Sequence, residues 1–390
     1  MNTTHIVVLG GGYAGTMAAN RLSAVAATVT LVNPRPQFVH RIRLHQWVAG
    51  TGRAEHDFAE VLADGVRLVV DTATRIDTAT GCVELASGER LPYDHLVYAV
   101  GSTAAVGDGI PGAREHGFLL GEWEAAQRLR AHLTTIPADA GIVVVGGGLT
   151  GMETAAELAD TGRPIRLVCG GSIAPSFGDR AREAARNRLT RLGVDVTEDH
   201  RVTAVGPDSV TVMGTDGALR VLPSAATIIT AGFGVPDLAA RSGLTTDPLG
   251  RLLTDDTLTS VDDPRIVGAG DAVAPSNRPF RMSCQAANQL GPQAADTVRA
   301  HVAGSEPTPV SVAFVGQCTS LGRRGATVQL THRDDAPGRI VVTGRTAAAI
   351  KELVCRSVIW GLRMEARRPG ITPRVGGQER ALVPEPTAAQ

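Results

Sequence analysis

The chain has 390 residues, of which 43% are hydrophobic and 20% charged, a composition typical of a folded protein with two or three domains. Its 38 basic and 39 acidic residues give a formal net charge of −1 and only 3% of residues are aromatic, so nucleic acid is not an expected partner. The five cysteines show no paired spacing, and no apolar run approaches the ~18 residues of a membrane-spanning helix, so neither a metal site nor a transmembrane anchor is expected.

The first predicted elements form a strand–turn–helix–strand unit. His5–Leu9 is a short apolar run typical of a buried parallel strand, and Gly10, Gly12 and Gly15 follow it with G-x-G-x-x-G spacing. Gly10 permits a tight turn, Gly12 lets a pyrophosphate approach the backbone, and Gly15 lets the next helix pack closely on the strand. The amides and positive dipole at the start of that helix favour phosphate, and the strand Thr28–Val32 completes the unit.

The same unit recurs at GIVVVGGGLTGMETAAEL, where Gly146, Gly148 and Gly151 each follow their counterparts by 136 positions. Because the motif occurs twice in the same strand–turn–helix context, we interpret both copies as ligand-binding turns rather than as glycine turns without a ligand. They predict two dinucleotide cofactors in one chain, FAD and either NADH or NADPH. The nicotinamide would deliver hydride, and the flavin would pass the electrons on.

With these motifs the chain resembles flavoprotein oxidoreductases with two dinucleotide-binding domains, more closely the type II NADH dehydrogenases and apoptosis-inducing-factor-like flavoproteins, over about residues 5–350. The resemblance implies an α/β fold with two Rossmann-like, three-layer ββα domains, one inserted in the other, and a small α+β C-terminal domain. It places the FAD-binding domain at 1–110 and 233–305, the NAD(P)H-binding domain at 111–232, the C-terminal domain at 306–368 and a disordered tail at 369–390.

Several segments resemble family motifs at the flavin. In RIVGAGDAV the resemblance assigns Asp271 to the ribityl chain, a role compatible with that of a helix cap. The segment Phe38–Gly50 would run over the flavin, where Arg41 and its basic neighbours would stabilise the reduced ring or, alternatively, form a solvated loop. His45 in this segment is a candidate proton donor or covalent flavin anchor. The complete expected set of cofactor-binding residues is Gly10, Gly12, Tyr13, Ala14, Gly15, Asn33, Arg35, Arg41, Gly101, Gly146, Gly148, Leu149, Thr150, Gly151, Cys169, Gly232, Gly270, Asp271 and Gln285.

Three residues are predicted to take part in catalysis. Glu153 matches a family carboxylate beside the nicotinamide and flavin rings, where burial would raise its pKa and let it hold or relay a proton; alternatively it is a first-turn glutamate favoured by the helix dipole. Gln285 and Gln289 match the glutamines of a family helix that abuts the flavin and the acceptor pocket, with Cys284 in place of an alanine. The alternative for both is a solvent-facing helix position.

Two positions depart from the usual dinucleotide pattern. Asn33 stands where an acidic residue usually binds the adenosine ribose, which weakens but does not abolish the FAD prediction, and nearby Arg35 is either a contact to adenine or phosphate or simply solvated. Cys169 stands at the corresponding place in the second copy. The choice between NADH and NADPH therefore stays open, with NADH favoured only by the resemblance.

The C-terminal region is predicted to hold strands at Ser311–Val315, Ala326–Leu330 and Ile340–Thr343, followed by a helix at Thr346–Arg368. On this helix Ile350, Leu353, Val354, Val358 and Leu362 are expected on one side, with arginines beside them. That pattern fits a core-packed helix or, alternatively, peripheral contact with a membrane surface. A homodimer is a further expectation from the family.

The sequence therefore predicts a cytoplasmic FAD-dependent NAD(P)H oxidoreductase, with contact to the inner face of the cell membrane as an alternative. Its acceptor is expected to be a small molecule, most naturally a quinone. One alternative is a reductase for a protein carrier such as ferredoxin. Another is a slow-turnover flavoprotein whose redox state controls binding.

Overall fold

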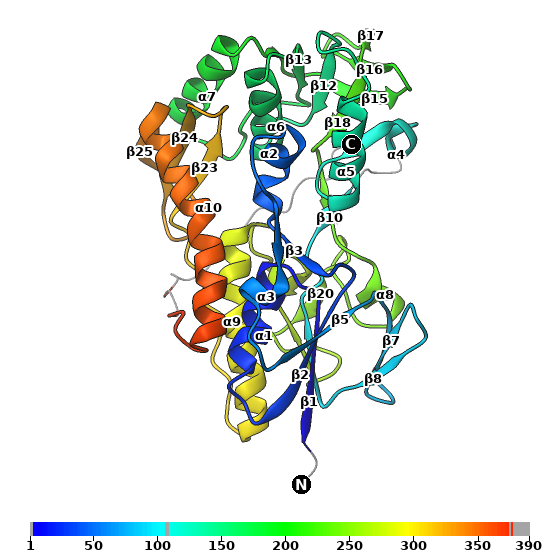
Figure 1. Ribbon diagram of the computed structural model, residues 1–390, viewed down its shortest axis with the longest axis vertical. Helices are drawn as coiled ribbons and strands as arrows, with labels where there is room; N and C mark the ends of the chain where they lie inside the picture. Colours follow the sequence, from blue (N-terminus) through cyan, green and yellow to red (C-terminus); the bar gives the residue numbers. More distant parts are fainter. Residues whose placement is uncertain (1–2, 106–108, 374–375, 377–390) are drawn as a thin grey trace.

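A computed structural model describes residues 3–105, 109–373 and 376. The molecule has a lower and an upper Rossmann-like domain, and a C-terminal unit runs along one side of both (Figure 1). The predicted α/β fold with two such domains and a C-terminal α+β unit is confirmed.

The lower domain is built on a five-stranded parallel sheet in the order β21-β9-β1-β2-β5. The strands are β1 (Thr4–Leu9), β2 (Ala27–Asn33), β5 (Val66–Val70), β9 (His95–Tyr98) and β21 (Ile266–Gly268). Alternate residues of β1 face opposite layers: Ile6 and Val8 pack with helices α1 (Tyr13–Leu22) and α9 (Cys284–Ala303), whereas Val7 and Leu9 pack with the antiparallel strands β6 (Ala73–Asp77), β7 (Cys82–Leu85) and β8 (Arg90–Pro92). This is the predicted three-layer ββα arrangement.

The upper domain repeats this plan with the sheet order β11-β18-β12-β13-β14. Its strands are β11 (Gly117–Leu119), β12 (Ile142–Val145), β13 (Ile165–Val168), β14 (Asp195–Thr197) and β18 (Ala226–Ile229). Helices α5 (Trp123–Leu133), α6 (Leu149–Asp160) and α7 (Asp179–Arg191) belong to it, as do the antiparallel strands β15 (Arg201–Val205), β16 (Ser209–Met213) and β17 (Leu219–Pro223). The chain enters and leaves it through the paired crossovers β10 (Thr103–Ala104) and β19 (Phe233–Gly234), so this domain is an insertion in the lower one.

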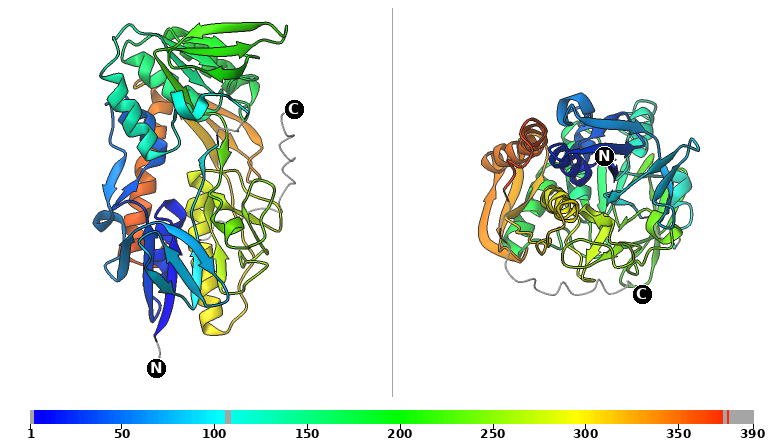
Figure 2. Two further views of the ribbon diagram at one scale, coloured as in Figure 1. Left: turned by 90° about the vertical axis from the view of Figure 1, so that its right-hand side faces the viewer. Right: turned by 90° about the horizontal axis from the view of Figure 1, so that it is seen from below.

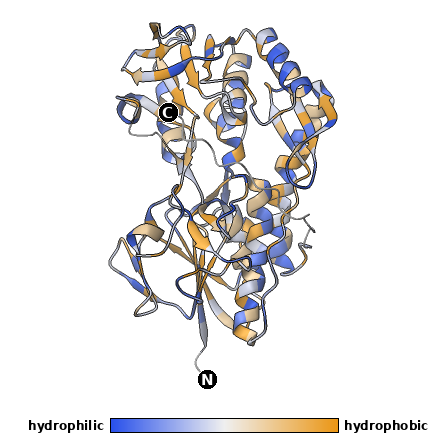
Figure 3. Cartoon of the chain, turned by 180° about the vertical axis from the view of Figure 1, so that it is seen from behind, coloured by the Kyte–Doolittle hydropathy of each residue, from blue (hydrophilic) through white to orange (hydrophobic). Residues whose placement is uncertain are grey.

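Shorter elements complete the two domains. They are β3 (Gln37–Val39), η1 (Arg41–Arg43), α2 (Leu44–Val48), β4 (Glu55–Asp57), α3 (Phe58–Val61), α4 (Ala113–His116), α8 (Leu238–Arg241), β20 (Leu252–Thr254), η2 (Gly270–Ala272) and β22 (Val273–Pro275). The strands are the most hydrophobic parts of the chain, whereas the helices carry hydrophilic stretches (Figure 3). This is the pattern of buried parallel sheets covered by amphipathic helices.

The C-terminal unit is an antiparallel sheet of β23 (Gly316–Ser320), β24 (Ala326–Thr331) and β25 (Pro337–Thr343), followed by α10 (Gly344–Arg367). The predicted strand at Ser311–Val315 is wrong, because those residues form no strand and the first strand of this sheet begins at Gly316. Figure 2 shows α10 beside both Rossmann-like domains. The predicted disordered tail at 369–390 lies largely outside the described residues.

The faces of α10 also differ from the prediction. Val358 and Leu362 are buried as expected, but Leu353 is 68% exposed and the buried stripe instead includes Lys351 and Cys355. Trp360, which is 64% exposed, lies on the open side. Among the described residues, no helix is both long and apolar enough to cross a membrane.

Candidate functional site

The first glycine turn has the geometry of a phosphate cradle. Gly10 has φ +99°, and a Cβ on it would lie 2.4 Å from the Ala99 carbonyl oxygen. A Cβ on Gly15 would lie 1.8 Å from the Gly10 carbonyl oxygen, so only glycine allows this close turn. By contrast, a Cβ on Gly12 would meet nothing within 4 Å, and no side chain caps the helix that begins there. The first-turn amides of α1 therefore face open space, as an anion site requires.

The three glycines of the second turn have nearly the same geometry as those of the first. Gly146 has φ +121°, a Cβ on Gly151 would lie 1.9 Å from the Gly146 carbonyl oxygen, and a Cβ on Gly148 would meet nothing within 4 Å. Leu149 and Thr150 form the uncapped first turn of α6. Both cradles therefore fit a dinucleotide pyrophosphate at a helix N-terminus.

A cavity of about 350 Å³ extends from the first cradle, and its volume lies in the range of ligand sites. Asn33, Arg35, Arg41 and Gly101 from the predicted set line it. It is also lined by three glycines of the turn and by residues from the upper domain and the crossovers, Gly121, Glu122, Trp123 and Pro236. The inserted domain thus forms one wall of this cavity.

Asp271 lies at the head of a polar chain that reaches this cavity. Its Oδ2 accepts a 2.7 Å hydrogen bond from the Ser102 hydroxyl and its Oδ1 accepts one of 3.2 Å from the Ser283 amide. Arg41 Nη1 donates to the Ser102 carbonyl at 2.9 Å. Burial raises the pKa of Asp271, while Ser102 and Arg41 oppose that shift. The loop that carries Asp271 lies close against α1, since a Cβ on Gly270 would lie 3.1 Å from Ala14 Cβ.

Asn33 and Arg35 organise the rim of the cavity. The Asn33 side chain accepts from the Gly11 amide at 2.9 Å and donates to the Arg35 carbonyl at 2.7 Å, so it fixes the turn itself. The Arg35 guanidinium forms two bonds of 2.6 and 2.7 Å with Glu124 of the upper domain. Arg35 is therefore a partner of the inserted domain rather than a freely solvated arginine.

Glu153, four residues into α6, is buried against the C-terminal unit. Its Oε1 lies 3.0 Å from Lys351 Nζ of α10 and accepts a 3.0 Å hydrogen bond from the Ser320 amide. Lys351 also donates to the Cys318 carbonyl at 3.2 Å. Burial alone raises the pKa of Glu153, but the Lys351 ammonium and the Ser320 amide outweigh it, so the pKa is lowered. The expectation of a raised pKa at Glu153 is wrong, because its cation comes from a distant part of the chain.

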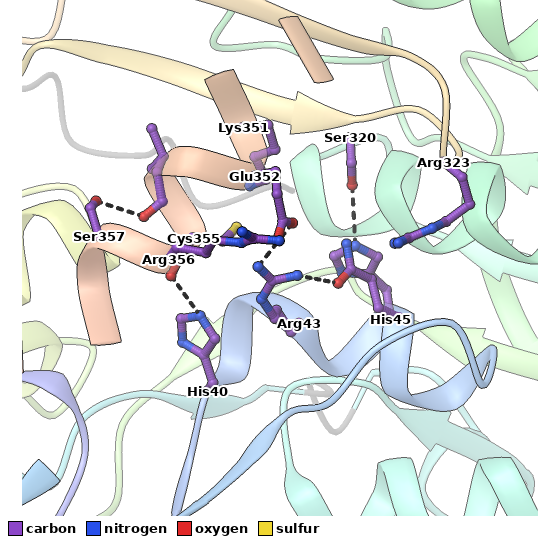
Figure 4. Close-up of polar contacts among 12 residues, drawn as sticks. His40, Arg43, His45, Ser320, Arg323, Lys351, Glu352, Cys355, Arg356 and Ser357 are labelled. Carbon is purple, nitrogen blue, oxygen red and sulfur yellow. Dashed lines mark hydrogen bonds and ion pairs between the residues drawn. The ribbon is translucent and has the colours of Figure 1, made fainter. Parts of the chain in front are cut away.

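His45 stands beside this ion pair without a charge of its own. Its Nε2 lies 3.1 Å from the Ser320 hydroxyl (Figure 4) and its Nδ1 lies 3.7 Å from Glu153 Oε2. Burial lowers the pKa of His45 to about 4, and burial together with Arg43 lowers that of His40 to about 3. His40 bonds the Cys355 carbonyl of α10 at 3.1 Å (Figure 4). Both imidazoles therefore join the lower domain to the C-terminal unit in their neutral form.

The segment with Arg41 and His45 connects the two cradles. Arg41 contacts the Ser102–Asp271 chain beside the first cavity, and four residues later His45 contacts Glu153, which follows the second cradle on α6. One short stretch of chain thus touches the polar groups of both predicted cofactor sites. Such proximity is what transfer between two cofactors requires.

The comparisons with known proteins agree with this geometry. The family model described as pyridine nucleotide-disulphide oxidoreductase matches residues 4–297. The chain belongs to the pyridine nucleotide-disulphide oxidoreductase family. It is 31% identical over 317 residues to an NADH dehydrogenase-like protein of Mycobacterium tuberculosis, covering 74% of this chain and 78% of that protein. It is 26% identical over 396 residues to a type II NADH:quinone oxidoreductase of Staphylococcus epidermidis, covering 92% and 95%.

Two solved structures share the fold. NDH2 from Plasmodium falciparum in complex with NADH has a TM-score of 0.79 at 16% identity and covers 94% of this chain and 97% of its own. A sulfide:quinone oxidoreductase from Aquifex aeolicus has a TM-score of 0.77 at 19% identity and covers 93% and 92%. As a member of its family, the chain is an NAD(P)H-dependent flavin oxidoreductase.

In this family member the predicted acceptor-side glutamines bind the backbone of the C-terminal unit. Gln289 donates to the Ala313 carbonyl at 3.0 Å and accepts from its amide at 3.1 Å, and Gln293 does the same with Ser311 at 2.8 and 2.7 Å. The Gln285 amide, in the orientation that suits its neighbours, accepts from Val315 at 2.7 Å and donates to Gly316 at 3.1 Å. The solvent-facing alternative is therefore wrong for these side chains.

We call these three glutamines of α9 and their backbone partners the glutamine ladder. It forms because the spacing of side chains along the helix matches the spacing of residues along the extended segment. Four residues of an α-helix rise about 6 Å, and two residues of extended chain span nearly the same distance, about 6.6 Å. Side chains spaced four apart on α9 therefore meet every second residue of the extended segment. The ladder satisfies the peptide groups of Ser311 and Ala313, while the Phe314 amide donates to the Arg333 carbonyl and the Val315 carbonyl accepts from the Thr331 amide.

Other predicted cofactor residues lie near the cradles without facing the cavity. The Tyr13 hydroxyl lies 3.1 Å from His40 Nδ1 and accepts from the Ile42 amide at 3.3 Å, within the core. Cys169 is buried beneath the second turn, and burial raises its thiol pKa to about 12. A Cβ on Gly232 would lie 2.6 Å from the Ala105 carbonyl oxygen, so this glycine serves the contact between the crossovers.

Ser102, Ser320 and Lys351 were not predicted from the sequence. Ser102 and Ser320 carry no pattern that would distinguish them. Lys351 did carry a signal, because it is the single lysine of a chain whose other basic residues are all arginines. It also falls on the buried stripe of α10, where a charge needs a partner.

We expect acid to weaken the fold through the two buried histidines. Their folded-state pKa values of about 4 and 3 lie below the unfolded value of about 6.5, so stability is present above pH 6.5 and is lost as the pH falls toward 4. Between pH 7 and 5 each histidine should cost about 2 kcal/mol of unfolding free energy. Urea unfolding across this range measures it. His45→Gln should flatten the pH dependence, and exposed His5→Gln should not; equal slopes would contradict neutral burial of His45.

Proposed function

We propose that the protein oxidises NAD(P)H with FAD and passes the electrons to a small quinone-like acceptor. The observation that carries this proposal is the pair of matching cradles, whose Gly12 and Gly148 positions are both open at uncapped helix starts. The names of relatives, type II NADH:quinone oxidoreductases among them, support the acceptor class. FAD, when bound, supplies the chemistry of accepting hydride from the nicotinamide and releasing electrons to the acceptor.

The residues of the chain would divide this work. The first cradle and the Asp271–Ser102–Arg41 chain would hold FAD, with Arg41 favouring negative charge on the ring. The second cradle would hold the nicotinamide coenzyme. Because Lys351 keeps Glu153 ionised, we propose Glu153 as a positioning residue that fixes α10 near the reacting rings, rather than as a proton donor.

Gln285 and Gln289 would shape the acceptor side through the segment they bind, as positioning residues. NADH is proposed as the preferred donor from the relatives' names alone, since Cys169 offers no carboxylate for the ribose and no cation for a 2′-phosphate. Exposed Leu353 and Trp360, beside Arg356 on α10, are proposed as the face for peripheral membrane contact.

Anaerobic stopped-flow mixing tests the proposal. NADH added to the FAD-loaded protein should bleach the visible flavin absorbance rapidly, and menadione should restore it faster than oxidised ferredoxin does. Gly141→Ala, which changes an open glycine outside the cradle, serves as a control that should react like the native protein. A flavin that neither NADH nor NADPH bleaches would refute the donor. A reduced protein that persists in excess quinone would refute the acceptor and favour the redox-sensing alternative.

A further inference from the structure

A second cavity of about 350 Å³ lies apart from both cradles, where the end of α7 meets the corner between β24, β25 and α10. In Figure 1 this is the place beside α7 from which α10 descends. Its polar lining combines Asn187 and two threonines with four arginines, namely Arg188, Arg191, Arg324 and Arg345. No carboxylate lines it.

The four arginines are not neutralised by the described protein. Among the described residues, no Asp or Glu forms an ion pair with any of them, although most other arginines of the chain have such partners. Arg188 is oriented by a 3.1 Å bond from its Nε to the Leu321 carbonyl. Gly325 makes room for it, because a Cβ there would lie 2.7 Å from Arg188 Nε. The cavity is thus lined by four positively charged side chains, and the glycine at position 325 leaves space for the guanidinium of Arg188.

The helix ends account for only part of this arrangement. Arg188 and Arg191 lie in the last turns of α7, where the helix dipole favours cations. Arg345 is different, because it lies in the first turn of the 24-residue α10, at the positive end, where a cation is disfavoured. That turn has no acidic residue, and its N-cap Thr343 makes no side-chain capping bond. An anion between the helices would offset both the arginine charges and the helix end.

We propose that this cavity binds a small phosphate-bearing anion, such as a diphosphate or a phosphate ester. Planar guanidiniums bind phosphate oxygens in pairs, and amide and hydroxyl groups supply the remaining hydrogen bonds. The volume lies in the range of small-ligand sites. The proposal does not depend on the identity of the electron acceptor.

Such an anion would tie the inserted domain to the C-terminal unit. Arg188 and Arg191 belong to the former, and Arg324 and Arg345 to the latter. Lys351 follows Arg345 on the same helix by less than two turns, and its ammonium contacts Glu153 after the second cradle. An anion in the cavity would therefore stabilise the contact between α10 and the nicotinamide side.

Calorimetric titration of inorganic diphosphate into the FAD-loaded full chain, with saturating NAD⁺ to occupy the cofactor sites, tests the proposal. Arg191→Gln with Arg345→Gln should weaken the dissociation constant at least tenfold. Arg180→Gln with Arg367→Gln removes the same charge from exposed positions of the same two helices, outside the cavity, and should change it less than twofold. Binding should also weaken as chloride is raised.

Three results would overturn the proposal: binding of neither diphosphate nor anionic vesicles, equal weakening by both double variants, or diphosphate binding that appears only when NAD⁺ is omitted. The last would place the anion in a cofactor cradle. Vesicles containing phosphatidylglycerol form the second arm. If the native protein binds these vesicles but not diphosphate, and only the cavity variant loses vesicle binding, the phosphate belongs to a lipid headgroup. That result would support the same recognition of phosphate by the arginines.

Discussion

Replacing Lys351 with methionine is expected to lower the free energy of unfolding by about 3–5 kcal/mol, because the change leaves Glu153 buried without its cation. The Lys351 ammonium lies 3.0 Å from Glu153 Oε1, and both side chains are buried. A carboxylate cannot remain ionised there without paying the full desolvation penalty. It must either take up a proton or draw water into the contact between α6 and α10.

Urea unfolding of the FAD-loaded protein measures this loss. The matched control is Arg356→Met, which removes the cation of an exposed ion pair with Glu352 on the same helix and should cost less than about 1 kcal/mol. Glu153→Leu combined with Lys351→Met should recover most of the loss, since a buried ion pair is often replaceable by apolar side chains. If Lys351→Met costs no more than Arg356→Met, then the buried pair is not ionised as described.

Gly148→Ala is expected to raise the dissociation constant for NADH at least tenfold, about 1.4 kcal/mol, while leaving FAD bound and the fold intact. Gly148 has φ −71° and ψ 177°, which alanine adopts readily, and a Cβ there would meet no protein atom within 4 Å. The added methyl group would occupy the space in which the pyrophosphate must approach the backbone. Its cost therefore falls on the ligand and not on folding.

Fluorescence titration with NADH and thermal unfolding, carried out side by side, separate these two effects. Gly12→Ala is the reciprocal variant, since it should weaken FAD retention and spare NADH binding. Gly141→Ala, also in open space but before β12, should change neither property. Unchanged NADH affinity in Gly148→Ala would show that the second turn is not the nicotinamide cradle.

The cradles were predictable because their chemistry is local. The turn, the close approach and the helix start all lie within six residues, so spacing alone specifies Gly10, Gly12 and Gly15. The structure places Asp271 beside the first cavity through Ser102 and Arg41. Its role toward the ribityl chain stays a prediction, and no sequence pattern pointed to Ser102.

The state of Glu153 was not predictable in the same way. Its pKa depends on Lys351, which only the folded chain brings beside it. The same ion pair explains the misjudged helix face, since a buried lysine interrupts the apolar pattern and leaves Leu353 exposed where the periodicity placed it inside. Ser311–Val315 was misread as a strand because its apolar, β-branched sequence fits any extended chain, whatever its partner.

The hydrogen bonds between the glutamines of α9 and the residues from Ser311 to Gly316 use only main-chain atoms of that segment, while Val312 and Phe314 pack with α9 in the core. These hydrogen bonds therefore do not depend on which side chains the segment carries, although packing still constrains Val312 and Phe314. Insertions and deletions have a different effect. If the segment shifted by one residue along α9, each glutamine carboxamide would face the wrong peptide group, whereas a shift of two residues would restore the pairing. The hydrogen bonds of the glutamine ladder therefore constrain the parity of the segment's length rather than the identity of its residues.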